Sequence, residues 1–454
     1  MNDHAIVIGG SVSGLLTARV LADHFHHVTL IERDSYPTQM QFRSGVPQGR
    51  HLHVLLMRGL AILRQLFPTI DADFHAAGAV ELDLECDAIA YMAQGWLPRK
   101  TSLYHTFSST RPLIDWVLTQ RVRALPNVQI MERGEVIDLL SNTGHQRVTG
   151  VMVRNRETGS EHVMHADLVV DASGRSSRLP TWLEAMGYGT PQEHVVNSFL
   201  GYASRFYAPP SDWNADWKGV TIGAIVPKVP RGGIIFPVEG DQWLVTFGGA
   251  ARDYPPQDEA GFMAFARGLA HPLIADTLER ATPLSPIYSY RRTENRVLQI
   301  EQLTRLPSGF VALGDAVCAF NPIYGQGISS AAIAAELLGQ HLSTGDRGSA
   351  MWSLDFQRSL AKQNAVIWTM ATSEDVRYPT TEGGKPSRLD SFNQWYFQRV
   401  ISIINRDAEA MDTLLRVIHL VDPPTALMKP RILRKAVLSR ERPADRSEPP
   451  ARPA

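Results

Sequence analysis

The segment AIVIGGSVSGLL (residues 5–16) has the pattern of a buried strand that runs through a glycine-rich turn into a helix. The apolar run VTLIE (28–32) follows and predicts a second strand, which ends in an acidic residue. A strand–turn–helix–strand unit within about thirty residues is the context in which a G-x-G-x-x-G turn binds a dinucleotide. The two stretches therefore predict an α/β fold that begins with a nucleotide-binding unit.

The glycine turn departs from this pattern at its middle position, where Ser11 stands in place of glycine. Gly9 suits the tight turn, and Gly14 lets the helix approach the strand closely. Serine is small, and its hydroxyl can donate a hydrogen bond to a phosphate at the helix N-terminus. An ordinary α/β turn followed by an exposed glutamate is the alternative on this stretch alone. The residues expected to hold the nucleotide here are Gly9, Gly10, Ser11, Gly14, Glu32 and Arg33.

A second strand–turn–helix pattern lies far along the chain, in GDAVCAFNPIYGQGISSA (314–331). Asp315 stands at the turn, where it can accept hydrogen bonds from sugar-like hydroxyls, and an Ala-rich helix begins near Gly327. The start of a helix offers free N–H groups and a positive dipole end, which stabilise an anion. The alternative is a second α/β crossover in which the aspartate caps the helix.

Composition limits the class of protein. The chain has 454 residues, of which 44% are hydrophobic and 20% charged, as expected for a globular protein with more than one domain. Its net charge of −1 lacks the excess of positive charge that is typical of nucleic-acid-binding proteins. Cys86 and Cys318 are too few for a disulfide framework, so we expect a soluble protein in the reducing cytoplasm. Without a run of about eighteen apolar residues, we expect no integral membrane span. The sequence predicts no oligomeric state.

The nucleotide-type patterns lie at both ends of the first three quarters of the chain, and strand patterns broken by Pro and Gly lie between them. This order predicts an α/β fold, α+β overall. A discontinuous Rossmann-like domain carries an inserted antiparallel β-sheet substrate domain, and a C-terminal helical region follows. The expected parts are the cofactor domain (1–79, 105–180 and 290–345), a β-segment of the substrate domain (80–104), the substrate domain (181–289), the helical region (346–438) and a disordered tail (439–454).

Together, the two glycine segments resemble the group A flavin monooxygenases, which have the p-hydroxybenzoate hydroxylase-like fold. The resemblance covers about residues 4–345 and extends to RSGVPQGRHLH (43–53) and STRPLIDW (109–116). It implies FAD, with its ADP half at the first motif, its ribityl chain at G-D-A and its isoalloxazine against P-x-x-G-Q-G. For the two arginines, solvated surface charge is the alternative. The contacts implied in addition to the first motif are Arg43, Arg111, Val136, Asp171, Gly174, Asp315, Pro322, Gly325, Gln326 and Gly327.

The segment LVVDASGRSSR (168–178) departs from the family pattern. The family carries a D-G motif linked to FAD and NADPH handling, whereas here Ser173 precedes Gly174 and the acid lies earlier, at Asp171. D-A-S-G-R is more similar to variants in halogenases, geranylgeranyl reductases and polyene epoxidases. The electrons therefore come either from NAD(P)H bound directly or from a separate flavin reductase.

The motifs GVPQGRHLH, STRPLIDW and GDAVCAFNPIYGQG are most similar to those of the polyene epoxidases of polyether biosynthesis, distant relatives of squalene epoxidase. This implies an FAD-dependent monooxygenase that uses O2 and a flavin C4a-hydroperoxide to insert one oxygen atom into a hydrophobic organic substrate. Epoxidation of an alkene or polyene in secondary metabolism is the favoured reaction. The alternatives on the same fold are an aromatic hydroxylase and a reductase of prenyl double bonds. A halogenase is disfavoured because W-x-W-x-I-P is absent, and a non-enzymatic flavin- or lipid-binding protein is a further alternative.

Flavin chemistry needs no protein nucleophile and no metal, because the cofactor carries the reaction. His51 and His53 lack a third ligand within sequence reach, so we expect no metal site there. The substrate pocket is expected between the inserted sheet and the flavin, although strand aromatics are more often plain core. Its candidate residues are His53, Phe199, Tyr202, Phe206, Phe236, Phe247 and Tyr324.

The C-terminal stretches FNQWYFQRVISIINR (392–406) and MKPRILRKAVL (428–438) combine apolar or aromatic residues with basic ones. A docked helical cap is the expected structure. Contact with a membrane surface or a carrier protein is the alternative.

Overall fold

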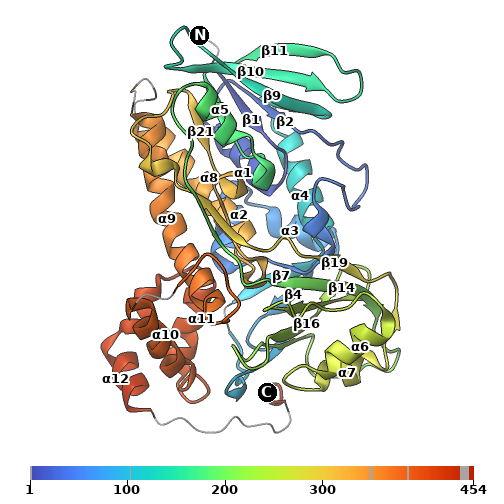
Figure 1. Cartoon of the computed structure of the whole chain (residues 1–454). Helices are drawn as coiled ribbons and strands as arrows, with labels where there is room; N and C mark the ends of the chain where they lie inside the picture. Colours follow the sequence, from blue (N-terminus) through green and yellow to red (C-terminus); the bar gives the residue numbers. More distant parts are fainter. Residues whose placement is uncertain are drawn as a thin grey trace.

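The computed structural model describes residues 3–102, 104–345, 347, 349, 351–385, 388–439 and 449–453. Its first layer is a parallel sheet in the order β21-β12-β1-β2-β8 (Figure 1). The inner strands are almost wholly apolar, as expected for parallel strands covered on both faces. The bounds are β1 His4–Ile8, β2 His27–Ile31, β8 Val128–Met131, β12 Leu168–Asp171 and β21 Phe310–Ala312.

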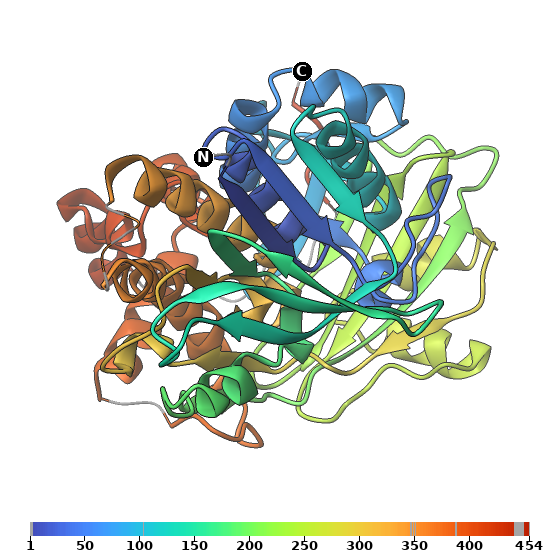
Figure 2. The same cartoon turned by 90° about the horizontal axis from the view of Figure 1, so that it is seen from above.

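Helices and a second sheet cover the parallel sheet. Helix α1 packs against α4 and α8, and α8 also contacts α2 and α9. Strand β10 of the antiparallel β11-β10-β9 sheet packs against β12 (Figure 2). The bounds are α1 Val12–Leu21, α2 Met57–Leu66, α3 Ile70–Ala76, α4 Arg111–Arg123, α5 Leu179–Ala185, α8 Gly327–Thr344, β9 Gly134–Ser141, β10 Val148–Asn155 and β11 Glu161–His165.

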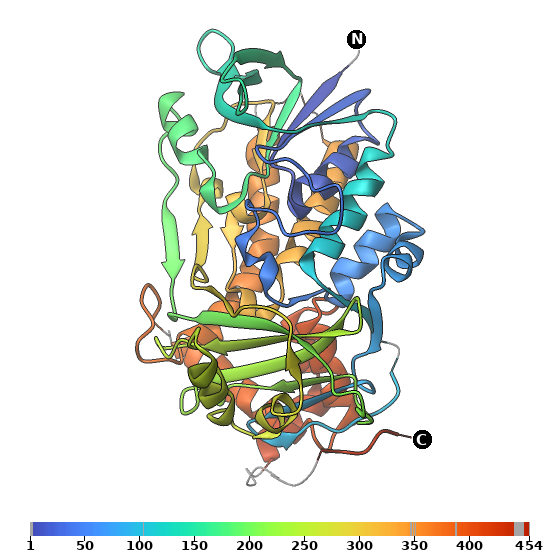
Figure 3. The same ribbon diagram turned by 90° about the vertical axis from the view of Figure 1, so that its right-hand side faces the viewer.

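The substrate domain is built on a large, mostly antiparallel sheet in the order β18-β14-β17-β16-β15-β5-β6, with β19 also paired to β14 (Figure 3). A tight hairpin turn at residues 239–241 joins β16 to β17. The bounds are β5 Ala88–Met92, β6 Gly95–Trp96, β14 Gly201–Ala208, β15 Gly219–Ile222, β16 Arg231–Val238, β17 Gln242–Gly249, β18 Thr282–Pro283, β19 Tyr288–Tyr290, α6 Glu259–Arg267 and α7 Leu273–Leu278.

Two small sheets join these domains: β3-β7-β4 and β13-β20-β22. The predicted fold class is confirmed, but the structure differs from one expected boundary, because β4 pairs with β7 and only β5 and β6 of residues 80–104 enter the large sheet. The bounds are β3 His53–Val54, β4 Val80–Asp83, β7 His105–Ser109, β13 Glu193–Val196, β20 Asn295–Leu298 and β22 Cys318–Ala319.

Helix α9 (Trp352–Asp375) lies within the helical region expected over residues 346–438, but it packs with the cofactor domain. Its Trp352, Phe356 and Leu360 are buried in the same core as the parallel sheet, so the cofactor domain extends into this helix. Helices α10 (Arg388–Ile401), α11 (Ala408–Ile418) and α12 (Pro430–Leu438) then form a cap with its own apolar core. Within the described residues, no helix combines the length and the apolar character needed to cross a bilayer.

Most of the tail expected to be disordered, residues 440–448 and 454, lies outside the described residues. In the described part, the Pro450 carbonyl accepts a hydrogen bond from Arg99, and the Arg452 guanidinium pairs with Asp87 at 2.7 Å. These contacts hold residues near the C-terminus against the substrate domain.

Candidate active site

A cavity of about 1190 Å³ runs between the cofactor domain and the substrate sheet. Small-molecule sites usually enclose about 300–1,000 Å³, so this cavity has room for a dinucleotide and a second ligand. Its lining combines residues from the α1 turn, residues 43–56, 172–178 and 315–331, strands β5, β15 and β16, and helices α10 and α11. The two glycine segments, far apart in sequence, therefore meet at one site.

The turn before α1 requires glycine at two of its positions. Gly9 has φ +97°, and a Cβ there would lie 2.6 Å from the Ala172 carbonyl oxygen. A Cβ on Gly14 would lie 1.7 Å from the carbonyl oxygen of Gly9, so any side chain would force α1 away from β1. Gly14 thus acts on packing and does not line the cavity, whereas Gly9 and Gly10 do.

Ser11 is the N-cap residue of α1, but its side chain makes no capping hydrogen bond. Its hydroxyl instead accepts a hydrogen bond from Arg111 Nη2 at 2.8 Å, and Arg111 Nε donates to Asp115 at 2.7 Å. Arg111 is 6% exposed, which rules out the surface-charge alternative. The serine therefore keeps the helix start open while a buried guanidinium lies beside it.

Glu32 and Arg43 converge on Gly10 from the other side of the turn. The Glu32 carboxylate accepts a hydrogen bond from the Gly10 N–H at 2.7 Å, and Arg43 Nη2 donates to the Gly10 carbonyl at 3.0 Å. The Arg43 guanidinium lies 4.8 Å from the centre of the Tyr36 ring, and its Nη1 is 3.5 Å from the Glu32 carboxylate. Its Nε and Nη1 are buried and make no hydrogen bond. A buried cation with unused donors is suited to an anionic ligand.

Arg33 and Val136 also line the cavity. Arg33 is exposed and follows β2, whereas Val136 is buried on β9 and is 7% exposed. Val136 thus offers backbone and a small apolar surface where the flavoprotein resemblance expects adenine.

The D-A-S-G-R segment forms a turn organised by a buried carboxylate. Asp171 is fully buried and accepts hydrogen bonds from the Ser173 backbone N–H at 2.9 Å and from the Ser177 hydroxyl at 2.5 Å. Burial raises the pKa of the Asp171 carboxyl. Asp171 does not line the cavity, so its role is to hold the shape of the turn. Gly174, which has φ +82° and open space where a side chain would lie, does line the cavity.

Asp315 lies in the cavity wall with its side chain about half exposed (46%). Arg175, which the sequence analysis did not single out, lines the same region, with its Nε 3.9 Å from the Asp315 carboxylate. Desolvation raises the pKa of Asp315, and the positive charges of Arg175 and Arg111 act against that rise. The open carboxylate can accept hydrogen bonds from ligand hydroxyls.

Asp375, at the end of α9, anchors the loop that precedes α8 through hydrogen bonds. Asp375 is 2% exposed and accepts hydrogen bonds from the Asn321 amide at 3.1 Å, the Asn295 amide at 2.6 Å and the Tyr324 hydroxyl at 3.0 Å. No motif marks Asp375, which is one acidic residue at the end of a long helix.

The turn of this loop has one residue in the left-handed region, Gly325, with φ +66°. Pro322, Gly325 and Gly327 line the cavity, and Gly327 has open space on its side-chain face. Gln326 is the N-cap position of α8; it is buried and does not line the cavity, and its Oε1 has no hydrogen-bond partner.

Four predicted pocket residues line the cavity: His53, Tyr202, Phe236 and Tyr324. The other three do not. Phe247 lies on the opposite face of the sheet, against Phe262 and Phe265. Phe206 packs in a small separate cluster, and Phe199 lies against the Arg252 guanidinium. Strand alternation explains the position of Phe247, because Ile234, Phe236 and Thr246 face the cavity while Ile235, Val245 and Phe247 face α6 and α7.

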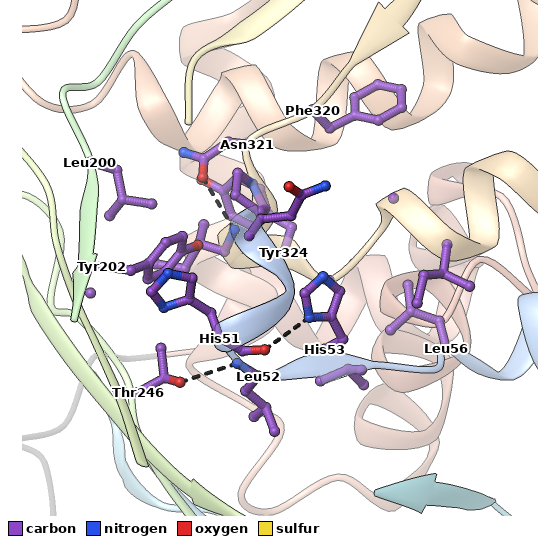
Figure 4. Close-up of a pocket in the computed structure, with 18 of the residues that line it drawn as sticks. His51, Leu52, His53, Leu56, Leu200, Tyr202, Thr246, Phe320, Asn321 and Tyr324 are labelled. Carbon is purple, nitrogen blue, oxygen red and sulfur yellow. Dashed lines mark hydrogen bonds between the residues drawn. The ribbon is translucent and has the colours of Figure 1, made fainter. Parts of the chain in front are cut away.

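His51 and His53 lie on either side of the loop that faces Tyr202 and Tyr324 (Figure 4). His51 Nδ1 is hydrogen-bonded to the Ser204 hydroxyl at 2.8 Å, and His53 Nδ1 to the His51 carbonyl at 2.9 Å. Burial and nearby arginines lower the pKa of His51 to about 4 and that of His53 to about 3, so both rings are neutral near pH 7. Within the described residues, no group of His, Cys, Asp or Glu side chains could hold a metal ion.

The cap supplies a wall of the cavity that was not predicted as part of the site. Helix α11 contributes Met411, Leu414, Leu415 and Ile418, which follow the spacing i, i+3, i+4, i+7 of one helix face. Helix α10 adds Phe397 and Ile401. The periodicity could have revealed an apolar face, but not that it borders a cavity.

These features fit FAD. Two helices without side-chain caps, α1 and α8, begin at the cavity, where Ser11 and Gly327 line it together with the open glycine position 174. Three guanidiniums, those of Arg43, Arg111 and Arg175, can neutralise a pyrophosphate, while Glu32 and Asp315 offer acceptors for hydroxyls. Between them lies room for a flat ring system against the 322–327 loop.

Comparisons with known proteins give the same assignment. The family described as FAD binding domain matches residues 3–356. Protein Rv3254 of Mycobacterium tuberculosis is 35% identical over 387 residues, which cover 83% of this chain and 81% of that protein. Among solved structures, the flavin-dependent brominase Bmp2 has a TM-score of 0.66 at 17% identity and covers 96% of this chain and 98% of its own. The probable FAD-dependent monooxygenase pqsL from Pseudomonas aeruginosa has a TM-score of 0.59 at 14% identity, covering 83% and 98%.

At these identities the solved structures are similar in fold alone. The match over residues 3–356 and the cavity at the two glycine segments concern the same part of the chain. The chain belongs to the FAD binding domain family and has the fold of the p-hydroxybenzoate hydroxylase-like group of FAD-dependent monooxygenases and halogenases.

Proposed function

We propose that the protein is an FAD-dependent monooxygenase that inserts one oxygen atom from O2 into a hydrophobic organic substrate, most favourably as the epoxidation of an alkene or polyene in secondary metabolism. The observation that carries the proposal is the continuity of one cavity from the cofactor motifs to an apolar wall. When bound, the flavin supplies the oxygen-transfer chemistry. The chain then has to bind, orient and enclose the substrate.

The apolar part of the cavity supports a hydrophobic substrate. Its wall is made of Ile89, Met92 and Leu97 from one side and of Ile401 and Leu415 from the cap. An apolar wall excludes water, which protects a reactive oxidant from hydrolysis and orients a ligand that has few polar groups.

Four polar side chains near the flavin loop are uncharged at pH 7. His51 and His53 are neutral at pH 7, and burial raises the pKa of both Tyr202 and Tyr324 well above the usual tyrosine value. These side chains can donate or accept hydrogen bonds but carry no charge. An uncharged alkene can lie against these four groups, while the cationic Lys228, Arg292 and Arg377 line other parts of the same cavity.

The source of electrons belongs to the same proposal. In the 171–177 turn, the Asp171 carboxylate accepts hydrogen bonds from residues of the turn itself, so it is not free to bind a ligand. Ser173 stands where the family pattern has an acid. We infer that a separate flavin reductase or another partner, drawing on NAD(P)H, supplies the reducing equivalents. We also infer a cytoplasmic location.

The test starts with an absorbance spectrum of the purified protein after addition of FAD. NADPH oxidation is then followed with and without an added flavin reductase, and products from polyenes and phenols are identified by mass and NMR. The proposal requires flavin bands, faster NADPH oxidation with the reductase, and an epoxide. Three other products would contradict the proposed epoxidation and indicate another reaction of the same fold. These are a product with halide-dependent incorporation of bromine or chlorine, a hydroxylated phenol, and a saturated prenyl chain.

A further inference from the structure

Exposed apolar side chains gather on the cap. Among the described residues, fourteen large hydrophobic side chains are exposed, and eight of them lie between residues 392 and 438. A soluble surface carries such residues singly, so a concentration of this kind indicates a contact surface. The eight are Phe392, Trp395, Val421, Met428, Leu433, Val437, Leu438 and Ile418, of which only Ile418 also borders the cavity.

Helix α12 presents the most concentrated part of this surface. It buries only Ile432 and Ala436, which lie one turn apart and face the cap core. Leu433 (41% exposed) and Val437 (47%) each follow one of these buried residues in sequence and form a second, exposed row along the helix. Leu438 at the helix end is 74% exposed. Three of the helix's five aliphatic side chains thus belong to no described core cluster.

The same helix is cationic. Lys429, Arg431, Arg434 and Lys435 lie in or next to it, and no acidic residue occurs between positions 423 and 439. Lys435 pairs with Asp407, whereas Arg431 and Arg434 are exposed and make no ion pair with any described residue. An amphipathic helix with apolar side chains between free cations fits the interface of an anionic bilayer.

The cap lies between the cavity and the exposed face of α12. Residues of α10 and α11 line the cavity. Helix α12 packs on α10 (Figure 1). We propose that the outer face of the cap, centred on Arg431, Leu433, Arg434 and Val437, docks on an anionic lipid surface. Docking would bring the apolar end of the cavity close to the lipid. The proposal concerns binding alone and stands whichever reaction the site catalyses.

Vesicle flotation of the FAD-loaded full chain tests it without turnover. The vesicles are phosphatidylcholine alone and an equimolar mixture of phosphatidylcholine and phosphatidylglycerol. We expect binding to the anionic vesicles, loss of binding in high salt through charge screening, and little binding to the neutral ones. R431E/R434E should weaken binding about tenfold or more, and L433E/V437E should do the same.

Matched controls are R267E/R280E, two exposed arginines on the substrate-domain helices and their ends, and V163E, an exposed apolar residue on β11. Both should bind as the parent does. The proposal is overturned by no binding to anionic vesicles or by equal loss in the controls. It is also overturned if light scattering shows a dimer that L433E/V437E dissociates, or if only an acidic carrier protein, and no vesicle, binds this face.

Discussion

The carboxylate of Asp375, the last residue of α9, accepts a hydrogen bond from the Tyr324 hydroxyl at 3.0 Å. It also accepts one from Asn321 at 3.1 Å, so a helix outside the parallel sheet fixes the loop that leads into α8. The geometry of the proposed flavin contact therefore depends on a residue more than fifty positions away.

Asp375→Ala should destabilise the protein by about 3 kcal/mol, because three buried donors lose their acceptor. Tyr324→Phe removes one of these bonds and should cost about 1 kcal/mol. Both should also shift the flavin absorbance bands, which report the surroundings of the ring. Denaturant unfolding and spectra of the FAD-loaded variants measure the two effects. Asp355→Ala, on the exposed side of α9, is the control, and an equal loss there would remove the special role of Asp375.

Arg111→Ala should weaken FAD binding about ten- to a hundredfold, since a charge-assisted hydrogen bond contributes about 1.5–3 kcal/mol. Arg111→Lys should recover part of the affinity through its charge. Fluorescence titration with FAD gives the Kd of each variant. Arg64→Ala, which removes an exposed guanidinium paired with Asp71, should leave the Kd unchanged. A parent-like Kd for Arg111→Ala would show that this guanidinium does not meet the cofactor.

Asp315→Ala should lower FAD occupancy about tenfold or more, because the carboxylate is the acceptor expected for the ribityl hydroxyls. Asp315→Asn keeps one oxygen acceptor and should fall between the two. Occupancy is read as the ratio of flavin to protein absorbance after purification. Full occupancy in Asp315→Ala would refute the assigned role, and Asp276→Ala on the exposed side of α7 serves as the reference.

The protein should lose stability as the pH falls from about 6.5 towards 4. Burial lowers the pKa of His51 and of His419 to about 4 and that of His53 to about 3. The unfolded chain therefore binds more protons in this range, at about 1.4 kcal/mol per pH unit for each fully contributing histidine. Buried Asp171 and Asp375, whose pKa values are raised, act in the opposite direction.

Single variants separate these contributions. The free energy of unfolding, measured by denaturant titration at pH 7 and pH 5, should differ less between the two pH values in His419→Gln than in the parent. The same flattening is expected for His51→Gln. If both variants kept the parent's pH dependence, these rings would not be neutral and buried in the folded protein.

Leu415→Ser should raise the KM for an apolar substrate about tenfold, because it removes about 1–2 kcal/mol of apolar contact from the cavity wall. The Kd for FAD should not change, since Leu415 lies on the cap and not among the cofactor motifs. Val366→Ser, an exposed position on α9, is the matched control. An unchanged KM together with an unchanged product would place the substrate elsewhere.

Much of the cofactor domain could be predicted because its constraints are local. Gly9 and Gly14 are required by backbone approach within one strand–turn–helix, and Arg111 starts a helix whose pattern is plain in the sequence. Asp375 could not be predicted, because its partners lie on other elements and are set by tertiary packing.

The substrate side was harder for a different reason. Both faces of the large sheet are apolar, one against α6 and α7 and the other against the cavity, so alternation alone could not separate Phe236 from Phe247. The cap poses the same difficulty, because the apolar stripe of α11 predicts burial without saying against what.

The central claim is that one cavity holds FAD and a hydrophobic substrate for transfer of one oxygen atom from O2. The most direct test reduces the FAD-loaded protein, adds a polyene under isotopically heavy O2, and analyses the product by mass spectrometry. The account predicts a product that carries one heavy oxygen atom as an epoxide. A product that is halogenated, that contains only light oxygen or that has gained only hydrogen would contradict it.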